Sequence, residues 1–326
     1  MDRMCDTRGD RMEMQPNDGT RSDLGRICVI MNGKSGRRDT DGVPGQIRQA
    51  LSNRAPSAEL RILDSGSDLL PATRKAVKEG FDMIVAAGGD GTVSGVASVL
   101  RGTGVTMGIL PLGTFNYFAR SLDIPTEIPA AVDLLCEGAA RPVRIARIND
   151  RVFLNNASLG AYPAILKTRE DVYRRWGRRR IAAYWSVLVT LVTLRRPLRV
   201  RIEADDKVLE RRTPLIFAVN NAFQLNQIGL QGEEDIAKGR LALFIAPDTN
   251  RWGMLRNALL LALGLAEREK EFDFLAADRI RIINNERRHD IACDGERDRM
   301  KAPYDLQVIE NELKVVAPLA RQSDTR

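Results

Sequence analysis

Residues 84–95 read IVAAGGDGTVSG, and this stretch decides how the fold is interpreted. Its unbroken apolar start is typical of a buried strand, and the glycines that follow would let backbone N–H groups approach a phosphate closely. A helix is expected from Thr92, which would act as its N-cap or as a donor to the phosphate. The carboxylate of Asp90 would repel such an anion unless a divalent cation lies between them. A plain turn between a strand and a helix is the alternative.

Two further loops repeat this pattern after neighbouring strands. MGILPLG (107–113) predicts a strand that runs into the loop PLGTFN (111–116), where Asn116 opens the next helix. RICVIMN (26–32) predicts the first strand, and NGKSG (32–36) is the turn after it. Glycine-bearing loops at three successive strand ends indicate a nucleotide or phosphate site rather than three unrelated turns.

The order of the expected elements predicts an α/β domain followed by a β domain. Strands alternate with helices over 26–140, with helices at 43–52 and 68–80, and this alternation predicts a parallel sheet. Short strands separated by turns then predict a mostly antiparallel β-sandwich over 141–318. The expected organisation is a disordered leader over 1–25, a nucleotide-binding α/β domain over 26–140, the sandwich over 141–318 and a tail over 319–326.

The composition restricts the classes of function. The 326 residues include 50 basic and 43 acidic ones, and the formal net charge of +7 favours anionic partners. The four cysteines form no CxxC pair, so neither a zinc site nor a disulfide framework is expected, and a reducing cytoplasm is favoured. His289 is the only histidine, so general-base catalysis is assigned to a carboxylate. No interleaved aromatic platform supports nucleic acid as a partner.

The two central motifs carry a family resemblance. IVAAGGDGTVSGVASVL followed by GILPLGTFNYFAR resembles the catalytic domain of the diacylglycerol kinase family, whose relatives include bacterial lipid kinases and the sphingosine and ceramide kinases. NGKSG is similar to the family's first nucleotide loop, and CDGE (293–296) looks like its DGE motif. The resemblance covers residues 26–318 in motif order. It implies a phosphofructokinase-like α/β domain, a β-sandwich and an active site in the cleft between them.

The resemblance also implies a reaction and its residues. ATP and Mg²⁺ would be bound, and the γ-phosphoryl group would pass to the hydroxyl of diacylglycerol or a similar lipid alcohol. Asp294 would be the general base, Glu296 its supporting carboxylate and Asp90 a metal ligand. The nucleotide and its metal would be held by Asn32, Ser35, Gly36, Gly88, Gly89, Asp90, Gly91, Thr92, Gly113, Thr114 and Asn116.

Two places depart from the family pattern. Tyr117 stands where many members have an aspartate of a metal-linked acidic network, and Phe115 and Tyr117 would shape the pocket instead. In IAKGRLALF (236–244), Lys238 and Ala242 stand where relatives commonly have the acids of a DDGxLD pattern. The second-domain metal site of some bacterial relatives is therefore in question here.

The stretch 173–196, YRRWGRRRIAAYWSVLVTLVTLRR, suggests how a lipid would be reached. Its apolar part is too short to span a bilayer, and arginines flank it on both sides. Such a helix suits the surface of an anionic membrane, with a helix buried against the sandwich as the alternative. A second helix at 252–271 is expected in the core. The sequence thus predicts a cytoplasmic protein peripherally bound to the inner face of the membrane, and it is compatible with a homodimer.

Two other functions stay open at this point. A kinase for a soluble hydroxyl substrate would also use the GGDGT loop, as NAD kinases and phosphofructokinases do, although 111–120 and 173–196 favour a lipid. A nucleotide- or lipid-binding regulator without catalysis is favoured by Tyr117 and Lys238 and opposed by the Asp294–Glu296 pair. The sequence does not separate diacylglycerol from ceramide, sphingosine or an undecaprenyl-type alcohol.

Overall fold

The structure is a computed structural model that describes residues 25–33, 42–160, 197–228, 230–248, 272–284 and 289–319. Ser35, Gly36, the helices predicted at 173–196 and 252–271, and nearly all of the predicted leader and tail lie outside these ranges. None of the described helices has the length and apolar character that crossing a membrane requires.

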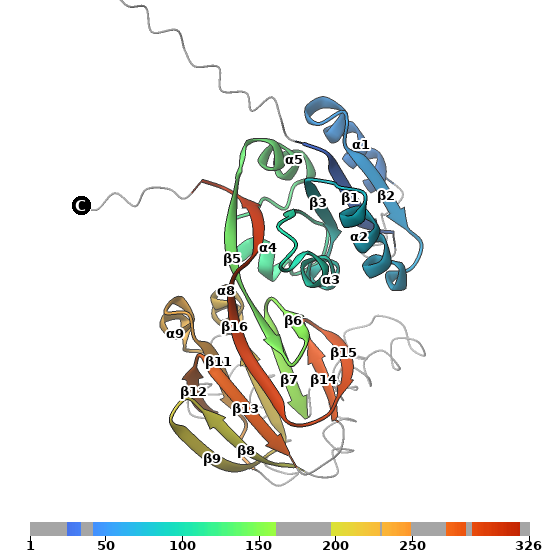
Figure 1. The fold of residues 1–326 in the computed structure, drawn as a ribbon. Helices are drawn as coiled ribbons and strands as arrows, with labels where there is room; N and C mark the ends of the chain where they lie inside the picture. The colour runs from blue at the N-terminus through green and yellow to red at the C-terminus, as the bar shows by residue number, and fades with distance from the viewer. Residues whose placement is uncertain are drawn as a thin grey trace, which may run out of the picture.

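The N-terminal part of the chain is a parallel sheet with helices on both faces (Figure 1). Its elements are β1 (Ile27–Asn32), α1 (Val43–Arg54), β2 (Glu59–Leu63), α2 (Leu69–Lys78), β3 (Met83–Gly88), α3 (Asp90–Leu100), β4 (Thr106–Pro111), α4 (Tyr117–Ser121) and α5 (Ile128–Glu137). The strand order is β2-β1-β3-β4, and each adjacent pair is parallel. Alternate residues of β1 face opposite sides: Cys28 and Ile30 pack with α2 and α3, whereas Val29 and Met31 pack with α1 and α5.

The apolar pattern explains why these elements were predictable. All of β3 is buried, because a central strand of a parallel sheet is covered by helices on both faces. The helices predicted at 43–52 and 68–80 are found as α1 and α2. The helix predicted from Thr92 begins two residues earlier, at Asp90.

The C-terminal part is an antiparallel sandwich, so the predicted fold class is confirmed. Its elements are β5 (Ala139–Ile148), β6 (Arg151–Phe153), β7 (Asn156–Gly160), β8 (Leu198–Ala204), β9 (Lys207–Thr213), β10 (Leu215–Val219), α8 (Ala222–Ile228), α9 (Glu233–Ala237), β11 (Leu241–Ile245), β12 (Asp273–Ala277), β13 (Arg279–Asn284), β14 (His289–Cys293), β15 (Glu296–Met300) and β16 (Tyr304–Ala317). One sheet has the order β12-β11-β10-β7-β14-β15, and it shares a core with β8, β13 and β16. Ile202, Ile216 and Leu243 are fully buried in that core.

The last strand, β16, belongs to both parts of the chain (Figure 1). Its start pairs antiparallel with β13, and its end pairs parallel with β4 through Lys314–Thr106 and Val315–Met107. It also runs antiparallel along β5, in which the predicted boundary at residue 140 falls. The N-terminal sheet is therefore completed by β16, and the order of motifs along the sequence gives no sign of this.

Leu313 on β16 tests this dependence, because it is 1% exposed and packs in the core of the N-terminal sheet. We expect Leu313→Ala to lower the free energy of unfolding by about 2–5 kcal/mol, since the change leaves a cavity in a packed core. The matched control is Leu319→Ala, at a side chain that is 71% exposed. Urea unfolding measures both variants, and equal midpoints for the two would show that β16 is not a structural part of the N-terminal core.

Candidate active site

The GGDGT and PLGTFN loops lie against each other through their glycines. A Cβ atom placed on Gly113 would lie 2.6 Å from the Cα of Gly89 and 2.7 Å from Oδ1 of Asn116. A Cβ on Gly88 would lie 2.4 Å from Oγ1 of Thr92. No other residue type fits at these distances, so the glycines are needed for the two strand ends to meet.

The start of α3 supplies free N–H groups beside these glycines. Gly89 is the N-cap in an extended conformation, and it provides no side-chain cap. The first-turn N–H groups of a helix have no acceptor within the helix and carry its positive dipole end, which suits a phosphate. The expectation that Thr92 is the N-cap is wrong: Thr92 lies in the first turn, is 4% exposed and packs against Gly88. The flexible glycines before it let the helix start earlier.

Asn116 shapes the second loop from within. Its backbone is left-handed, with φ of 51°, and its side chain is buried. Its Oδ1 accepts a hydrogen bond from the Gly113 N–H, and its Nδ2 donates to the Gly113 carbonyl, both at 3.0 Å. Thr114 and Phe115 are left exposed at the loop tip, where the Phe115 ring stacks on Tyr117 at 5.3 Å between centroids.

Asp90 joins the first loop to the second. Its Oδ1 accepts hydrogen bonds from the Phe118 N–H at 3.3 Å and from Nδ2 of Asn155 at 3.4 Å. Burial raises the pKa of the Asp90 carboxyl, and N–H groups at the start of α4 oppose that effect. Within the ranges that the structure describes, no cluster of three or more His, Cys, Asp or Glu side chains could hold a metal. A metal at Asp90 stays a prediction.

Asp294 occupies a tight hairpin turn between β14 and β15. Asp294 and Gly295 have φ of 49° and 84° and lie between the paired residues Cys293 and Glu296. Asp-Gly is a favoured sequence for such a two-residue turn. The DGE motif therefore has a structural role in addition to any chemical one.

The Asp294 carboxylate accepts four hydrogen bonds. Oδ2 accepts from Oγ of Ser94 and from the Leu154 N–H, both at 2.7 Å. Oδ1 accepts from the N–H groups of Asn155 at 2.8 Å and Asn156 at 3.1 Å. Burial raises the pKa of Asp294, and these donors act in the opposite direction because they stabilise the charged form. Ser94 lies on α3, so the DGE turn is bonded directly to the helix that follows GGDGT.

Glu296 lies over the start of α3. Its Oε2 forms an ion pair with Nη2 of Arg151 at 2.8 Å, and a Cβ on Gly91 would lie 2.9 Å from its Oε1. At the same edge of the sheet, Asn32 ends β1, one residue beyond the Met31–Ala87 register pair with β3. The structure thus brings together the GGDGT loop, the PLGTFN loop and the DGE turn, while Ser35 and Gly36 fall outside the described residues.

Sequence reasoning missed the amides that connect these groups. Asn155 is almost fully buried, donates to Asp90 and accepts from Nδ2 of Asn221 at 2.7 Å. Two Asn-Asn pairs, in VFLNN (152–156) and FAVNN (217–221), each follow an apolar strand. Paired amides directly after a buried strand need partners inside the protein, so this pattern could have predicted a polar network.

The stretch 236–244 contains none of the acids of a DDGxLD pattern and includes the cations Lys238 and Arg240. Ala242 is buried on β11, and the Lys238 side chain is exposed after α9. The guanidinium of Arg144 donates to the carbonyls of Ile236 and, at 3.1 Å, of Asn220. The Arg144 guanidinium therefore satisfies a carbonyl of α9. Arg144, Lys238 and Ala242 offer no oxygen ligand from their side chains, so they do not fit a divalent metal.

Comparisons with known proteins agree with this geometry. Residues 26–148 match the family model "Diacylglycerol kinase catalytic domain". A diacylglycerol kinase of Bacillus subtilis (strain 168) is 29% identical over 285 residues, which cover 83% of this chain and 89% of that protein. A protein of Pseudomonas aeruginosa (strain UCBPP-PA14) named "Probable lipid kinase YegS-like" is 36% identical over 161 residues, 48% of this chain and 51% of that protein.

The solved structures show the same architecture. A crystal structure of a diacylglycerol kinase from Bacillus anthracis str. Sterne superposes with a TM-score of 0.64 at 21% identity and covers 91% of this chain and 98% of that one. The fold and the sequence matches define a two-part kinase with a nucleotide sheet and a β-sandwich. Residues 26–148 thus match the catalytic domain of diacylglycerol kinases, and over most of its length the chain is similar to diacylglycerol kinase-like lipid kinases.

Gly113 offers a direct test of the loop contact. In Gly113→Ala the new methyl group would push the two loops apart, and overpacking of this kind costs about 1–3 kcal/mol. We expect the dissociation constant for ATP to rise roughly tenfold or more. Fluorescent-nucleotide titration measures it, with Gly45→Ala as the control because no atom lies within 4 Å of a Cβ there. Unchanged ATP affinity in Gly113→Ala would place the nucleotide elsewhere.

Proposed function

We propose that this protein transfers the γ-phosphoryl group of ATP to the hydroxyl of diacylglycerol or a similar lipid alcohol, with Asp294 as general base. The observation that carries the proposal is the bond between Ser94 and Asp294 at 2.7 Å. It holds a carboxylate with a raised pKa next to the helix that begins at the phosphate loop. Phosphoryl transfer to an alcohol needs these two components side by side.

The residues at the loops fit a nucleotide. The close approach of Gly89 and Gly113 leaves backbone N–H groups without covering side chains, and the exposed Thr114 hydroxyl is free to donate. When bound with ATP, Mg²⁺ neutralises charge on the phosphate oxygens. We expect the ion to be held mostly by those phosphates and by Asp90, because magnesium in kinases usually has only one or two protein carboxylates.

The base function follows from the bonds of Asp294. Three of its four donors are backbone N–H groups of residues 154–156, which are fixed by the strands around them. The fourth is the Ser94 hydroxyl, which can rotate. A substrate hydroxyl can take the position of Ser94 and pass its proton to Oδ2 as its oxygen attacks. Glu296 would support this site through its position over α3 and its pair with Arg151.

The remaining expectations concern the surroundings of the reaction. The family assignment implies a lipid substrate, and the arginine-flanked stretch at 173–196 supports binding to an anionic membrane surface from the cytoplasm. A homodimer is compatible with this arrangement. Neither the exposed cations nor the aromatic content of the chain favours nucleic acid.

The reaction can be tested with purified protein, ATP and Mg²⁺ in micelles that contain diacylglycerol, ceramide, sphingosine or a long-chain polyprenol. We expect ATP consumption to depend on one of these lipids, and the labelled product identifies it. In Asp294→Asn we expect kcat to fall by at least about 100-fold while ATP still binds, because the glycine loops are unchanged. Asp298→Asn is the matched control, on the same hairpin and exposed.

Two outcomes would contradict the proposal. ATP binding without transfer to any lipid would favour a kinase for a soluble hydroxyl substrate or a regulator without catalysis. A wild-type rate in Asp294→Asn, in a preparation that is active, would show that another group is the base.

The pH dependence gives a sharper test of Asp294. A base must be deprotonated, so kcat/KM should rise with pH through the raised pKa of Asp294. Ser94→Ala removes a donor to the charged carboxylate, so the pKa should rise further and the acid limb should move to higher pH. Ser98→Ala, one turn along α3 and bonded only to the Gly95 carbonyl, is the control. If the acid limb of the kcat/KM profile did not move in Ser94→Ala, the group that titrates in that limb would not be Asp294.

A further inference from the structure

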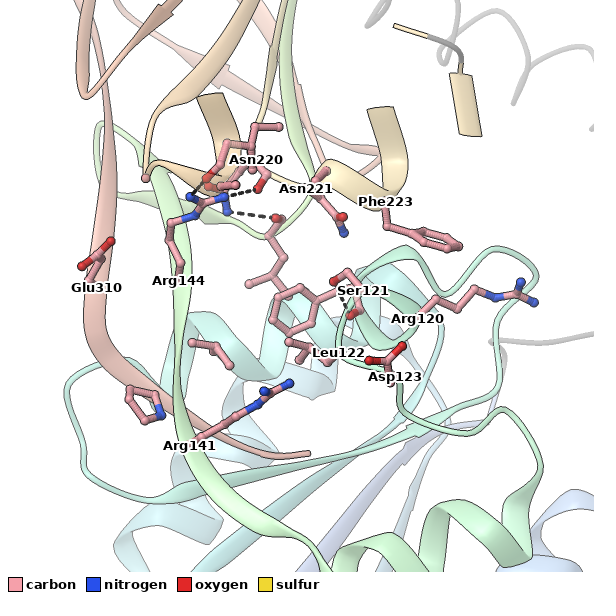
Figure 2. Close-up of a pocket in the computed structure, with 18 of the residues that line it drawn as sticks. Arg120, Ser121, Leu122, Asp123, Arg141, Arg144, Asn220, Asn221, Phe223 and Glu310 are labelled. Carbon is pink, nitrogen blue, oxygen red and sulfur yellow. Dashed lines mark hydrogen bonds between the residues drawn. The ribbon is translucent and has the colours of Figure 1, made fainter. Parts of the chain in front are cut away.

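A cavity of about 970 Å³ lies between the two parts of the chain (Figure 2). Its walls come from α4, β5, α8, α9 and β16, and it is lined by neither the loop glycines nor the DGE turn. Leu154 borders it, and the N–H of the same residue bonds Asp294. The cavity is thus next to the candidate active site but separate from it, and its size is at the upper end of that of small-molecule sites.

The cavity carries an excess of positive charge. Arg141 and Arg144 both extend into it from β5, as Figure 2 shows, and the exposed Arg120 and Lys238 also line it. Its acids are Asp123 and Glu310. Four cations therefore line the cavity with two anions, and of the four only Lys238 pairs with a carboxylate among the described residues, that of Glu234 at 3.9 Å.

The arginines of the cavity lack carboxylate partners among the described residues. Elsewhere on the surface, arginines such as Arg54, Arg211 and Arg281 each form an ion pair with a carboxylate. Arg144 instead bonds neutral carbonyls, and burial lowers its pKa although Glu310 opposes this. The Nε of Arg141 is buried and has no hydrogen-bond partner in the described part of the chain. Both guanidinium groups can therefore accept an anion without breaking an existing pair.

A second polar atom of the wall also lacks a partner. Asn220 lines the cavity and is 4% exposed. Its Nδ2 donates to the Leu154 carbonyl at 3.2 Å, which fixes the orientation of the amide, and its Oδ1 accepts no bond in the described ranges. A buried acceptor of this kind needs a donor, and a hydroxyl group on a ligand would provide one if the amide moved toward the cavity, because the oxygen itself is buried. Phe118, Leu122 and Phe223 supply apolar parts of the wall, and Ser121 and Asn221 add further polar groups.

We propose that this cavity is a second ligand site, which binds a phosphomonoester that also carries a hydroxyl group and an apolar body. Arginine forks match phosphate oxygens, the Asn220 oxygen would accept from the hydroxyl, and the apolar walls would hold the body. A lipid monophosphate and a small soluble phosphate share the phosphate chemistry, and binding distinguishes between them. The proposal does not depend on the kinase reaction.

Calorimetric titration of the full chain without nucleotide tests the site, because no phosphoryl transfer can then occur. The ligands are monodecanoylglycerol phosphate below its micelle concentration, glycerol phosphate and neutral monodecanoylglycerol. We expect the lipid phosphate to bind and Arg141→Gln to weaken it about tenfold, as the loss of one charge-assisted bond implies. Arg199→Gln, at an exposed position on β8, should leave binding unchanged. Lys238→Gln gives the same test should Arg141→Gln fail to fold.

The results distinguish a lipid monophosphate from a soluble phosphate, and binding in the cavity from binding at the nucleotide loops. Weaker binding of glycerol phosphate supports a lipid monophosphate as the ligand, whereas equal binding would overturn the requirement for an apolar body and leave a soluble phosphate as the ligand. Equal binding of neutral monodecanoylglycerol, or no effect of the Arg141 and Lys238 substitutions, would overturn the proposal. Phosphate binding that Gly113→Ala removes and Arg141→Gln leaves intact would place the anion at the nucleotide loops and would overturn it as well.

Discussion

The four hydrogen bonds to the Asp294 carboxylate determine how the two parts of this protein meet. A charged group removed from water is stable only when its oxygens are satisfied, and here the donors come from α3 on one side and from residues 154–156 on the other. The hairpin that carries Asp294 is itself rigid, because a two-residue turn allows little movement. This side chain therefore fixes the DGE turn against the start of α3, while β16 joins the two parts through its pairing with β4 and β13. Asn155 extends this control, since its N–H bonds Asp294 and its side chain bonds Asp90.

Much of this arrangement was predictable, for identifiable reasons. The parallel sheet followed from apolar runs that end in glycine loops, and the contact between Gly89 and Gly113 explains why those residues are glycines. The N-cap assigned to Thr92 was wrong because a glycine that adopts an extended backbone can begin a helix without a capping side chain. The Asn155 network and the bond from Ser94 to Asp294 connect residues far apart in sequence. The residue pattern of a single sequence does not show which distant residues will form such hydrogen bonds.

The departures from the family pattern have a common physical effect. Lys238 brings positive charge to the stretch 236–244, and both Lys238 and Arg144 line the cavity beside Leu154. Side chains on this surface can differ in charge without altering the surrounding strands, because backbone pairing does not depend on those side chains.

The pairing of β16 with β4 has a consequence for how the protein is made. Thr106 is synthesised about 200 residues before its partner Lys314. The edge of β4 therefore stays unpaired during most of synthesis, and contacts between residues this far apart in sequence form slowly. An open strand edge can pair with other chains, so this interval favours aggregation unless a chaperone covers it. A nascent chain cut short before β16 would carry the GGDGT and PLGTFN loops and still lack the strand that closes their sheet. Quality control of this protein would then depend on whether β16 has been synthesised.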